Sequence, residues 1–251
     1  MKNLLNFPFI LKKHQHIILL SHMRAYTSLF GHILGSHPEI EGYYEMHIGY
    51  YSWKSLIRQK LLYFKQHKPK RHAKFMFDKI LHNEHETSID ILKNEKVITV
   101  LSLREPLQTV LSIVKLYQKN NPEHEFATIE GATKYYLLRL DWLEKLALMI
   151  PGQYLYVDAE SIKSNPEDIL PFLTKKLKLS SNLLPSYSKQ KNTASGNTGD
   201  HSENITLGSI NKTKSNYPIQ NIPIDFQEQL NALYNKTRKT LISKSKFSYI
   251  L

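Results

Sequence analysis

Two arginines lie where short apolar runs give way to amphipathic segments, and both have hydroxyl side chains nearby. Arg24 follows the run "HIILL" and precedes Thr27 and Ser28 at the start of the next segment. Arg104 ends the run "KVITVLSL", and Ser112 lies eight residues further along the chain. Guanidinium groups, hydroxyls and the free N–H groups of a helix start all favour a bound phosphate. These residue types therefore predict anion binding.

Each segment, taken separately, also has an ordinary structural explanation. Thr27 and Ser28 are residue types that cap helices. The turn lacks the glycines and lysine of a G-x-x-x-x-G-K-[ST] loop, so a nucleotide kinase or ATPase is poorly supported. A surface pair of Arg104 with Glu105, and a serine bonded to its own helix, would account for the second segment. Spacing alone leaves both explanations open.

The composition agrees with an anionic partner. The 251 residues include 34 Lys and Arg against 22 Asp and Glu, which gives a net charge of +12. This excess favours nucleic acid, a membrane surface, or a phosphorylated or sulfated molecule. The basic run "KQHKPKRHAK" is typical of a solvated loop or of a docking site for a polyanionic acceptor. Because RNA-binding aromatic motifs are absent, no nucleic-acid partner is expected.

Metal and disulfide chemistry find little support. The chain has no cysteine, which excludes disulfides and thiolate metal sites. His82 and His85 in "HNEH" lack a third nearby ligand, so this spacing favours a surface helix face over a metal site. No run approaches the roughly 18 apolar residues of a membrane span, and no signal-peptide pattern is present. We expect a cytoplasmic protein without a transmembrane segment.

Strand-like and helix-like segments alternate along the chain. Apolar runs predict strands over 16–20, 74–78, 96–103 and 153–158. Periodicity predicts helices over 27–36, 52–66, about 80–93, from Pro106, over 129–149, from Pro166 and over about 225–243. A long polar loop is expected at about 180–216. This alternation predicts one α/β domain over residues 1–251, a parallel sheet flanked by helices, with ligands at the carboxyl ends of its strands.

In this order and spacing the motifs resemble the sulfotransferases that use 3′-phosphoadenosine 5′-phosphosulfate (PAPS). "RAYTSLFGHILGSHPEI" is similar to the family's R-S-G-T-[TS]-L turn and the helix that ends near H-P. "REPLQTVLS" resembles its R-[DN]-P motif with a serine eight residues after the arginine. "FDKIL", "VDAESIKSNPEDIL" and "ITLGSINKTKSNYP" match later elements, so the resemblance spans residues 16 to about 235. The stretch 37–46 is most similar to the protein-tyrosine and glycan branches.

The resemblance implies a three-layer fold like that of P-loop NTPases, and an enzyme without a metal. The implied reaction moves a sulfuryl group from PAPS to a hydroxyl of a glycan, glycolipid, peptide tyrosine or small metabolite, and releases adenosine 3′,5′-bisphosphate. The positive charge hints at an acidic acceptor, while the oligomeric state stays open. The alternative is a catalytically inactive nucleotide- or polyanion-binding protein on the same fold.

The resemblance also implies roles for individual residues. The donor-binding residues would be Arg24, Ala25, Tyr26, Thr27 and Ser28 at the 5′-phosphosulfate, Arg104 and Ser112 at the 3′-phosphate, and Lys212 in the late loop. Ala25 and Tyr26 stand where the family has Ser-Gly, so Tyr26 is expected in the pocket wall.

The catalytic base is expected a few residues after His37-Pro38. Glu45 matches the family's catalytic glutamate by this offset, and His47 is the reserve. Lys79 in "FDKIL" would stabilise the sulfuryl oxygens and orient Glu45.

Overall fold

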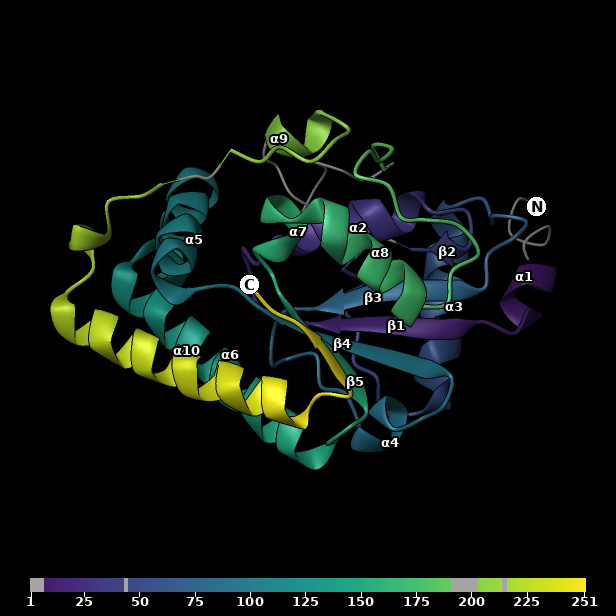
Figure 1. Ribbon diagram of the computed structural model, residues 1–251, viewed down its shortest axis with the longest axis horizontal. Helices are drawn as coiled ribbons and strands as arrows, with labels where there is room; N and C mark the ends of the chain where they lie inside the picture. The colour runs from purple at the N-terminus through teal and green to yellow at the C-terminus, as the bar shows by residue number, and fades with distance from the viewer. Residues whose placement is uncertain (1–6, 43–44, 191–202, 214–215) are drawn as a thin grey trace.

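The computed structural model describes residues 7–42, 45–190, 203–213 and 216–251. Within these ranges six parallel strands form one sheet, in the order β2-β3-β1-β4-β5-β6 (Figure 1). The strands are β1 (Gln15–Leu20), β2 (Ile40–Glu41), β3 (Phe75–Ile80), β4 (Val97–Leu103), β5 (Tyr154–Asp158) and β6 (Phe247–Tyr249). The parallel α/β architecture predicted from the alternating pattern is confirmed.

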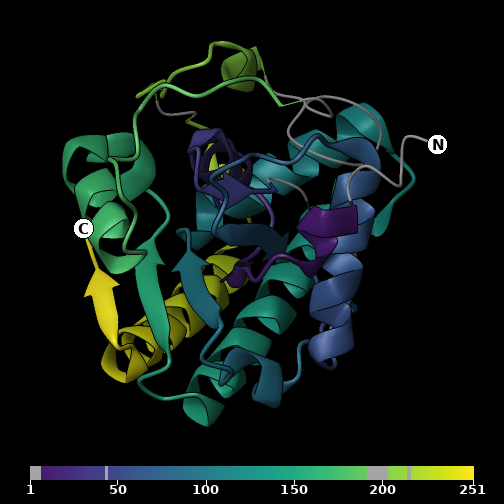
Figure 2. The same cartoon turned by 90° about the vertical axis from the view of Figure 1, so that its right-hand side faces the viewer.

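Helices cover both faces of this sheet, as Figures 1 and 2 show. One apolar cluster joins the sheet to α2 (Thr27–Ser36) and α8 (Pro166–Lys176). The other joins it to α3 (Trp53–Gln66), α5 (Pro106–Asn120), α6 (Ile129–Met149) and α10 (Ile224–Lys244). Shorter helices are α1 (Phe7–Leu11), α4 (Ile89–Leu92), α7 (Ser161–Ser164) and α9 (Glu203–Thr206).

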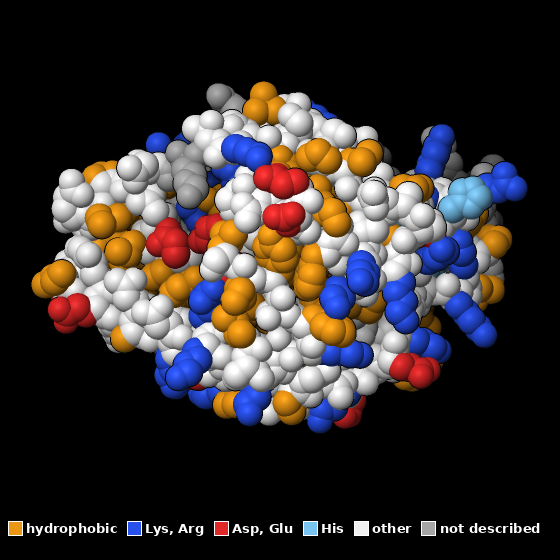
Figure 3. Space-filling model, in the orientation of Figure 1, with side chains coloured by type: hydrophobic (Ala, Val, Ile, Leu, Met, Phe, Trp, Pro, Cys, Tyr) orange, Lys and Arg blue, Asp and Glu red, His pale blue; other side chains and the backbone are white. Residues whose placement is uncertain are grey.

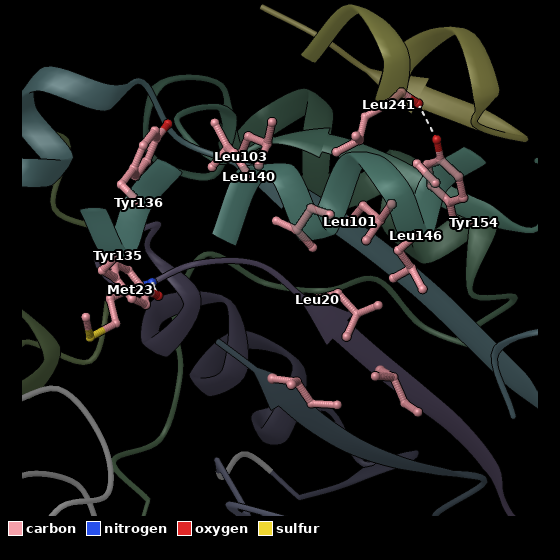
Figure 4. Packing of buried hydrophobic residues seen from close by; sticks show 14 of the residues in the cluster. Leu20, Met23, Leu101, Leu103, Tyr135, Tyr136, Leu140, Leu146, Tyr154 and Leu241 are labelled. Carbon is pink, nitrogen blue, oxygen red and sulfur yellow. Dashed lines mark hydrogen bonds between the residues drawn. The ribbon is translucent and has the colours of Figure 1, made fainter. Parts of the chain in front are cut away.

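The central strands are apolar on both faces because both faces are covered. Leu20 of β1 and Leu101 of β4 are fully buried in the same cluster as Leu140 of α6 (Figure 4). In the same view the hydroxyl of Tyr154 donates a 2.7 Å hydrogen bond to the carbonyl of Leu241, which ties β5 to α10. The buried tyrosine thus satisfies its polar group on a neighbouring helix.

The helix predicted over residues 80–93 is wrong. β3 continues to Ile80, and only Ile89–Leu92 is helical in this stretch. The guanidinium of Arg139 on α6 donates to the carbonyl of Ile80 and to the side-chain oxygen of Asn83. These tertiary bonds hold the chain after β3 in a loop, and sequence periodicity cannot reveal them.

The sheet edges and the late loop add detail. The short edge strands β2 and β6 were not expected from the sequence. Of the predicted loop, residues 191–202 and 214–215 lie outside the described residues. The described remainder contains α9 and an antiparallel bridge between Ser186 and Ser209. None of the helices in the described ranges is long and apolar enough to cross a membrane.

Candidate active site

A cavity of about 800 Å³ opens at the carboxyl ends of β1, β3 and β4. β1 lies between β3 and β4, so the chain continues from β1 toward one edge of the sheet first and toward the other edge later. Parallel sheets bind ligands at such a point, beyond the carboxyl ends of the strands. The predicted site residues that line it are Arg24, Tyr26, Thr27, Ser28, Glu45, His47, Lys79, Arg104 and Ser112. Ala25 is buried in the adjoining turn. Lys212 lies outside the lining, with its ammonium 3.3 Å from the carboxylate of Glu167.

The two arginine segments meet in this cavity. Arg24 Nε donates a 2.9 Å hydrogen bond to Ser112 Oγ, and Arg104 Nη1 donates a 2.8 Å bond to the carbonyl of Arg24. Arg104 is buried, and its Nε finds no hydrogen-bond partner among the described residues. Glu105 instead caps α5, because its carboxylate accepts from N–H groups of the first turn. The surface-pair explanation for Arg104 therefore does not hold.

The turn before α2 has an unusual backbone. Arg24 and Tyr26 adopt left-handed conformations, with φ of 63° and 54°. α2 begins at Thr27, so Thr27 and Ser28 lie inside the first turn rather than capping it. Tyr26 occupies the cap position and makes no side-chain capping bond within the described structure. The helix start therefore presents N–H groups and two hydroxyls to the cavity.

Contacts of the Tyr26 ring offset part of the cost of its left-handed backbone conformation, which glycine adopts more readily. The Arg104 guanidinium lies 4.5 Å from the centre of its ring, and the Lys163 ammonium lies 5.2 Å from it. Cations over an aromatic face are attracted by its quadrupole. Burial raises the pKa of the Tyr26 hydroxyl, although Arg104 opposes this shift. The ring stays neutral and forms a wall of the cavity beside both cations.

A carboxylate and an ammonium face each other at the end of β3. Lys79 Nζ lies 3.4 Å from Glu45 Oε2 and donates a 3.3 Å bond to Ser28 Oγ. Both side chains are buried. Within the described part of the chain, Glu45 Oε1 makes no hydrogen bond, and His82 Nε2 lies 4.0 Å away. A buried carboxylate oxygen with an unmade bond is a ready acceptor for a hydroxyl proton.

Asp78 fixes the loop that carries Glu45. Its carboxylate accepts from the Tyr50 hydroxyl at 2.6 Å and from the backbone N–H groups of Met46 and Lys79. Burial raises the pKa of Asp78 to about 7, while these donors oppose the shift. Sequence reasoning quoted this aspartate only as part of a motif. Its signal was a carboxylate that directly follows the apolar run Phe75–Phe77 within a strand.

His82 and His85 do not lie on a helix face, contrary to the sequence interpretation: His82 lines the cavity, and His85 packs beside His47. The His85 ring packs 5.5 Å from that of the exposed His47. Burial lowers the pKa of His82 despite the nearby Glu45, so His82 is neutral at neutral pH. Among residues 7–42, 45–190, 203–213 and 216–251, no group of three His, Asp or Glu side chains could hold a metal ion.

Two tyrosines of α6 join the loops around the cavity, and sequence reasoning missed both. The Tyr135 hydroxyl accepts from the N–H of Met23 and donates to the carbonyl of Leu81, both at 2.8 Å. The Tyr136 hydroxyl donates a 2.6 Å bond to the carbonyl of Arg104. The chain ends of β1, β3 and β4 are therefore attached to one helix.

Arg139 on the same helix strengthens this attachment. Its guanidinium donates to the carbonyls of Ser21 and Ile80, and it lies 4.5 Å from the ring centre of Trp142. Complete burial lowers the pKa of Arg139 only to about 10, so the side chain stays charged at neutral pH. The carbonyl dipoles around the cation offset its desolvation in place of a carboxylate.

The wall farther along α5 is uncharged. Leu116 and Asn120 follow Ser112 at intervals of four residues, and Tyr117, Asn121 and His124 complete this part of the lining. The lysines and arginines of the described lining are Arg24, Lys79, Arg104 and Lys163, all at strand ends or on α7. The cavity is therefore cationic at one end and neutral at the other.

Comparison with known proteins gave solved structures only: no family model matches the sequence, and no curated protein matches it. The sulfotransferase domain from the curacin biosynthetic pathway is 13% identical, with a TM-score of 0.56 over 87% of this chain and 98% of that chain. The sulfotransferase domain from the Synechococcus PCC 7002 olefin synthase is 16% identical, with a TM-score of 0.55 over 89% and 96%. Mouse sulfotransferase SULT7A1 complexed with PAP is 14% identical, with a TM-score of 0.53 over 95% and 90%. The chain has the α/β fold of the sulfotransferases.

Proposed function

We propose that the protein is a sulfotransferase that moves a sulfuryl group from PAPS to an acceptor hydroxyl. The observation that carries this proposal is a single cavity lined by both arginine segments and by the Glu45–Lys79 pair. The residues also fit such a donor, because Arg104 Nε and the start of α2 offer donors without side-chain partners in the described chain. Two phosphate-sized anions need such donors at two separate points.

The donor would be held at both ends by residues of this chain. Arg104 and Ser112 would bind the 3′-phosphate. Arg24 was expected at the 5′-phosphosulfate, but its guanidinium is bonded to Ser112, so we propose that it joins the 3′-phosphate site instead. Thr27, Ser28 and the N–H groups of α2 would bind the 5′ end. Lys212 remains a prediction for the late loop.

When bound, the donor supplies the sulfuryl group and a phosphate leaving group. Glu45 would accept the proton of the acceptor hydroxyl through its unbonded Oε1. Lys79, which touches both Glu45 and Ser28, would neutralise charge on the transferring oxygens. Asp78 would hold the Glu45 loop in place for this step.

The neutral wall along α5 is the proposed acceptor end. Amide and aromatic side chains such as Asn120, Asn121 and Tyr117 suit hydroxyl groups and flat rings. This wall supports an acceptor whose reacting portion is uncharged, in a glycan, glycolipid, peptide tyrosine or small metabolite. An acidic group elsewhere on the acceptor would meet the basic surface outside the cavity.

A catalytically inactive nucleotide-binding protein is the second candidate. It is favoured by Tyr26, a bulky residue within the donor turn whose ring packs against the Arg104 guanidinium. Glu45→Gln separates the two, because it removes the base while keeping the shape of the side chain. An enzyme keeps its affinity for adenosine 3′,5′-bisphosphate and loses at least about 100-fold in transfer rate. A protein without turnover transfers nothing before or after the substitution.

The assay would incubate the protein with radiolabelled PAPS and host-cell extract, and follow the labelled fraction. Glu86→Gln is the matched control, since Glu86 is exposed and outside the cavity lining. Donor affinity is measured separately by calorimetry. Failure to bind adenosine 3′,5′-bisphosphate at saturating concentration would contradict the whole proposal.

A further inference from the structure

Helix α3 carries an apolar stripe that the fold covers only in part. Trp53, Ile57 and Leu61 are spaced by four residues, and they are 61%, 38% and 42% exposed. Residues four apart lie on one side of a helix. The buried side of α3, which includes Leu56 and Phe64, borders this stripe, since Phe64 lies only three residues after Leu61. The apolar side of the helix therefore extends beyond the buried residues into a partly exposed stripe.

Cations lie beside this stripe. Lys54, Arg58 and Lys65 are exposed on α3, and the helix contains no acidic residue. None of these three forms an ion pair with any residue in the ranges that the structure describes. α3 forms the right-hand edge of the molecule in Figure 2, so its outer side faces away from the sheet.

The basic surface continues past the end of the helix. The loop between α3 and β3 carries the exposed Lys68 and Arg71, and the exposed Leu11 belongs to α1, which packs against α3. Figure 3 shows Lys and Arg side chains gathered at the right-hand end of that view, toward α1 and the start of β3. The exposed cations of this loop follow α3 directly in the chain, and α1 places an exposed apolar side chain on an element that packs against α3.

We propose that this outer side of α3, with the loop of residues 67–74, binds the surface of an anionic lipid membrane. A helix with an apolar stripe flanked by Lys and Arg lies in the plane of a lipid interface, where tryptophan is also favoured. Apolar side chains enter the headgroup boundary while the long cationic ones reach the lipid phosphates. The chemistry of the ligand is an anionic phospholipid headgroup over hydrocarbon.

Two other occupants fit less well. A second copy of the chain would place Lys54 and Arg58 against the same cations, and no acidic side chain of α3 would balance them. A hydrophilic polyanion would pair with the cations but would leave Trp53, Ile57 and Leu61 in water. A lipid surface satisfies both kinds of side chain.

The surface adjoins the rim of the cavity. The loop that carries Glu45 and the exposed His47 runs directly into the first turn of α3, past the exposed Tyr51. Membrane binding would therefore bring the cavity rim near lipid headgroups. The further consequence that the acceptor is a glycolipid headgroup rests on the proposed sulfotransferase function, whereas membrane binding does not.

The test uses the full chain without any nucleotide, so its outcome is independent of donor binding. The chain contains two tryptophans, and Trp142→Phe leaves Trp53 as the only tryptophan reporter. With vesicles of phosphatidylcholine and phosphatidylglycerol in equal parts, Trp53 emission should shift to the blue and the protein should sediment with the lipid. Vesicles of phosphatidylcholine alone should give neither signal. Salt at 1 M, where the screening length is about 3 Å, should weaken binding to the anionic vesicles.

Surface variants then separate the contributions. Lys54→Gln with Arg58→Gln should weaken vesicle binding about 25-fold, at about fivefold for each cation near the surface. Ile57→Ser with Leu61→Ser should weaken it at least about tenfold. Lys134→Gln with Leu148→Ser, both exposed on α6, is the matched control and should bind as the parent does.

Three outcomes would overturn the proposal. The first is an unchanged Trp53 emission with no sedimentation on anionic vesicles. The second is an equal loss of binding in the α6 control. The third is that the Ile57→Ser, Leu61→Ser variant binds vesicles as well as the parent and that soluble heparin abolishes this binding. That result would identify a polyanion-binding surface instead.

Discussion

Arg104→Ala tests whether the end of β4 holds the 3′-phosphate of the donor. The guanidinium is buried, donates to the carbonyl of Arg24, and keeps its Nε without a partner among the described residues. A phosphate bound there would receive a charge-assisted hydrogen bond in a largely desolvated setting. Alanine would remove both the charge and the bond, and leave the ligand's phosphate to Ser112 and Arg24 alone.

The expected loss follows from this burial. Removing one partner of a buried, hydrogen-bonded charge pair costs about 2–5 kcal/mol, which is about 30- to 4,000-fold in Kd. Adenosine 5′-phosphate lacks the 3′-phosphate, so its affinity should change less than about fivefold. This bound allows about 1 kcal/mol for the loss of the contact between Arg104 and the Tyr26 ring in the cavity wall. The discrimination between the two nucleotides should therefore collapse in the variant.

Titration calorimetry with both nucleotides measures this difference directly. Arg58→Ala is the control, because Arg58 is exposed on α3 and outside the cavity lining. The thermal midpoint of each ligand-free variant shows whether it is folded. Equal losses for both nucleotides, in a folded variant, would refute the assignment of Arg104 to the 3′-phosphate.

Three further predictions concern stability. Gly42→Ala should destabilise the protein more than Gly152→Ala does, as measured by thermal unfolding. Both glycines have a positive φ, at 87° and 73°. A Cβ at Gly42 would lie 2.4 Å from a backbone oxygen of β3, whereas a Cβ at Gly152 would meet open space. Burial lowers the pKa of His22 from 6.5 to about 3, so the unfolded chain binds this proton first as the pH falls. His22 alone should therefore lower the free energy of unfolding by about 1.4 kcal/mol per pH unit between pH 6.5 and pH 3, in addition to the effects of other groups such as His14 and His16. His22→Gln should reduce the slope by about this amount in denaturant titrations, and an unchanged slope would contradict the reasoning. Tyr50→Phe should cost about 1.5–3 kcal/mol in the free energy of unfolding at pH 8 and less at pH 5. The Tyr50 hydroxyl donates a 2.6 Å bond to Asp78, and burial raises the pKa of Asp78 to about 7, so the bond is strongest at pH 8, where this carboxyl is ionised. An equal cost at both pH values would argue against this reasoning.

Local patterns in the sequence predict much of the fold. Helix α2 begins at Thr27 and ends at Ser36, as expected, because His37 precedes a proline and leaves the helical region. Helix α6 likewise has the predicted bounds, Ile129–Met149. β4 was the clearest strand because its residues are apolar on both sides, and both sides are indeed covered.

What the sequence could not predict depends on contacts between distant segments. The chain after Ile80 is not helical, because the guanidinium of Arg139, far along the sequence, donates a hydrogen bond to the carbonyl of Ile80. The cavity residues at the ends of β1, β3 and β4 were expected near one another, because parallel sheets bind ligands at the carboxyl ends of their strands and because the motifs resemble those of one donor-binding family. The bond from Arg24 to Ser112 was not expected, since it depends on the left-handed turn at Arg24.

The attachment of three strand ends to α6 has a consequence for ligand entry. Tyr135, Tyr136 and Arg139 hold the loops after β1, β3 and β4 by hydrogen bonds that exist without any nucleotide. The loops cannot drift apart independently, so little ordering entropy is lost when an anion arrives. The conformational entropy of these loops is lost during folding, so the anion-binding loops are already ordered before the ligand binds.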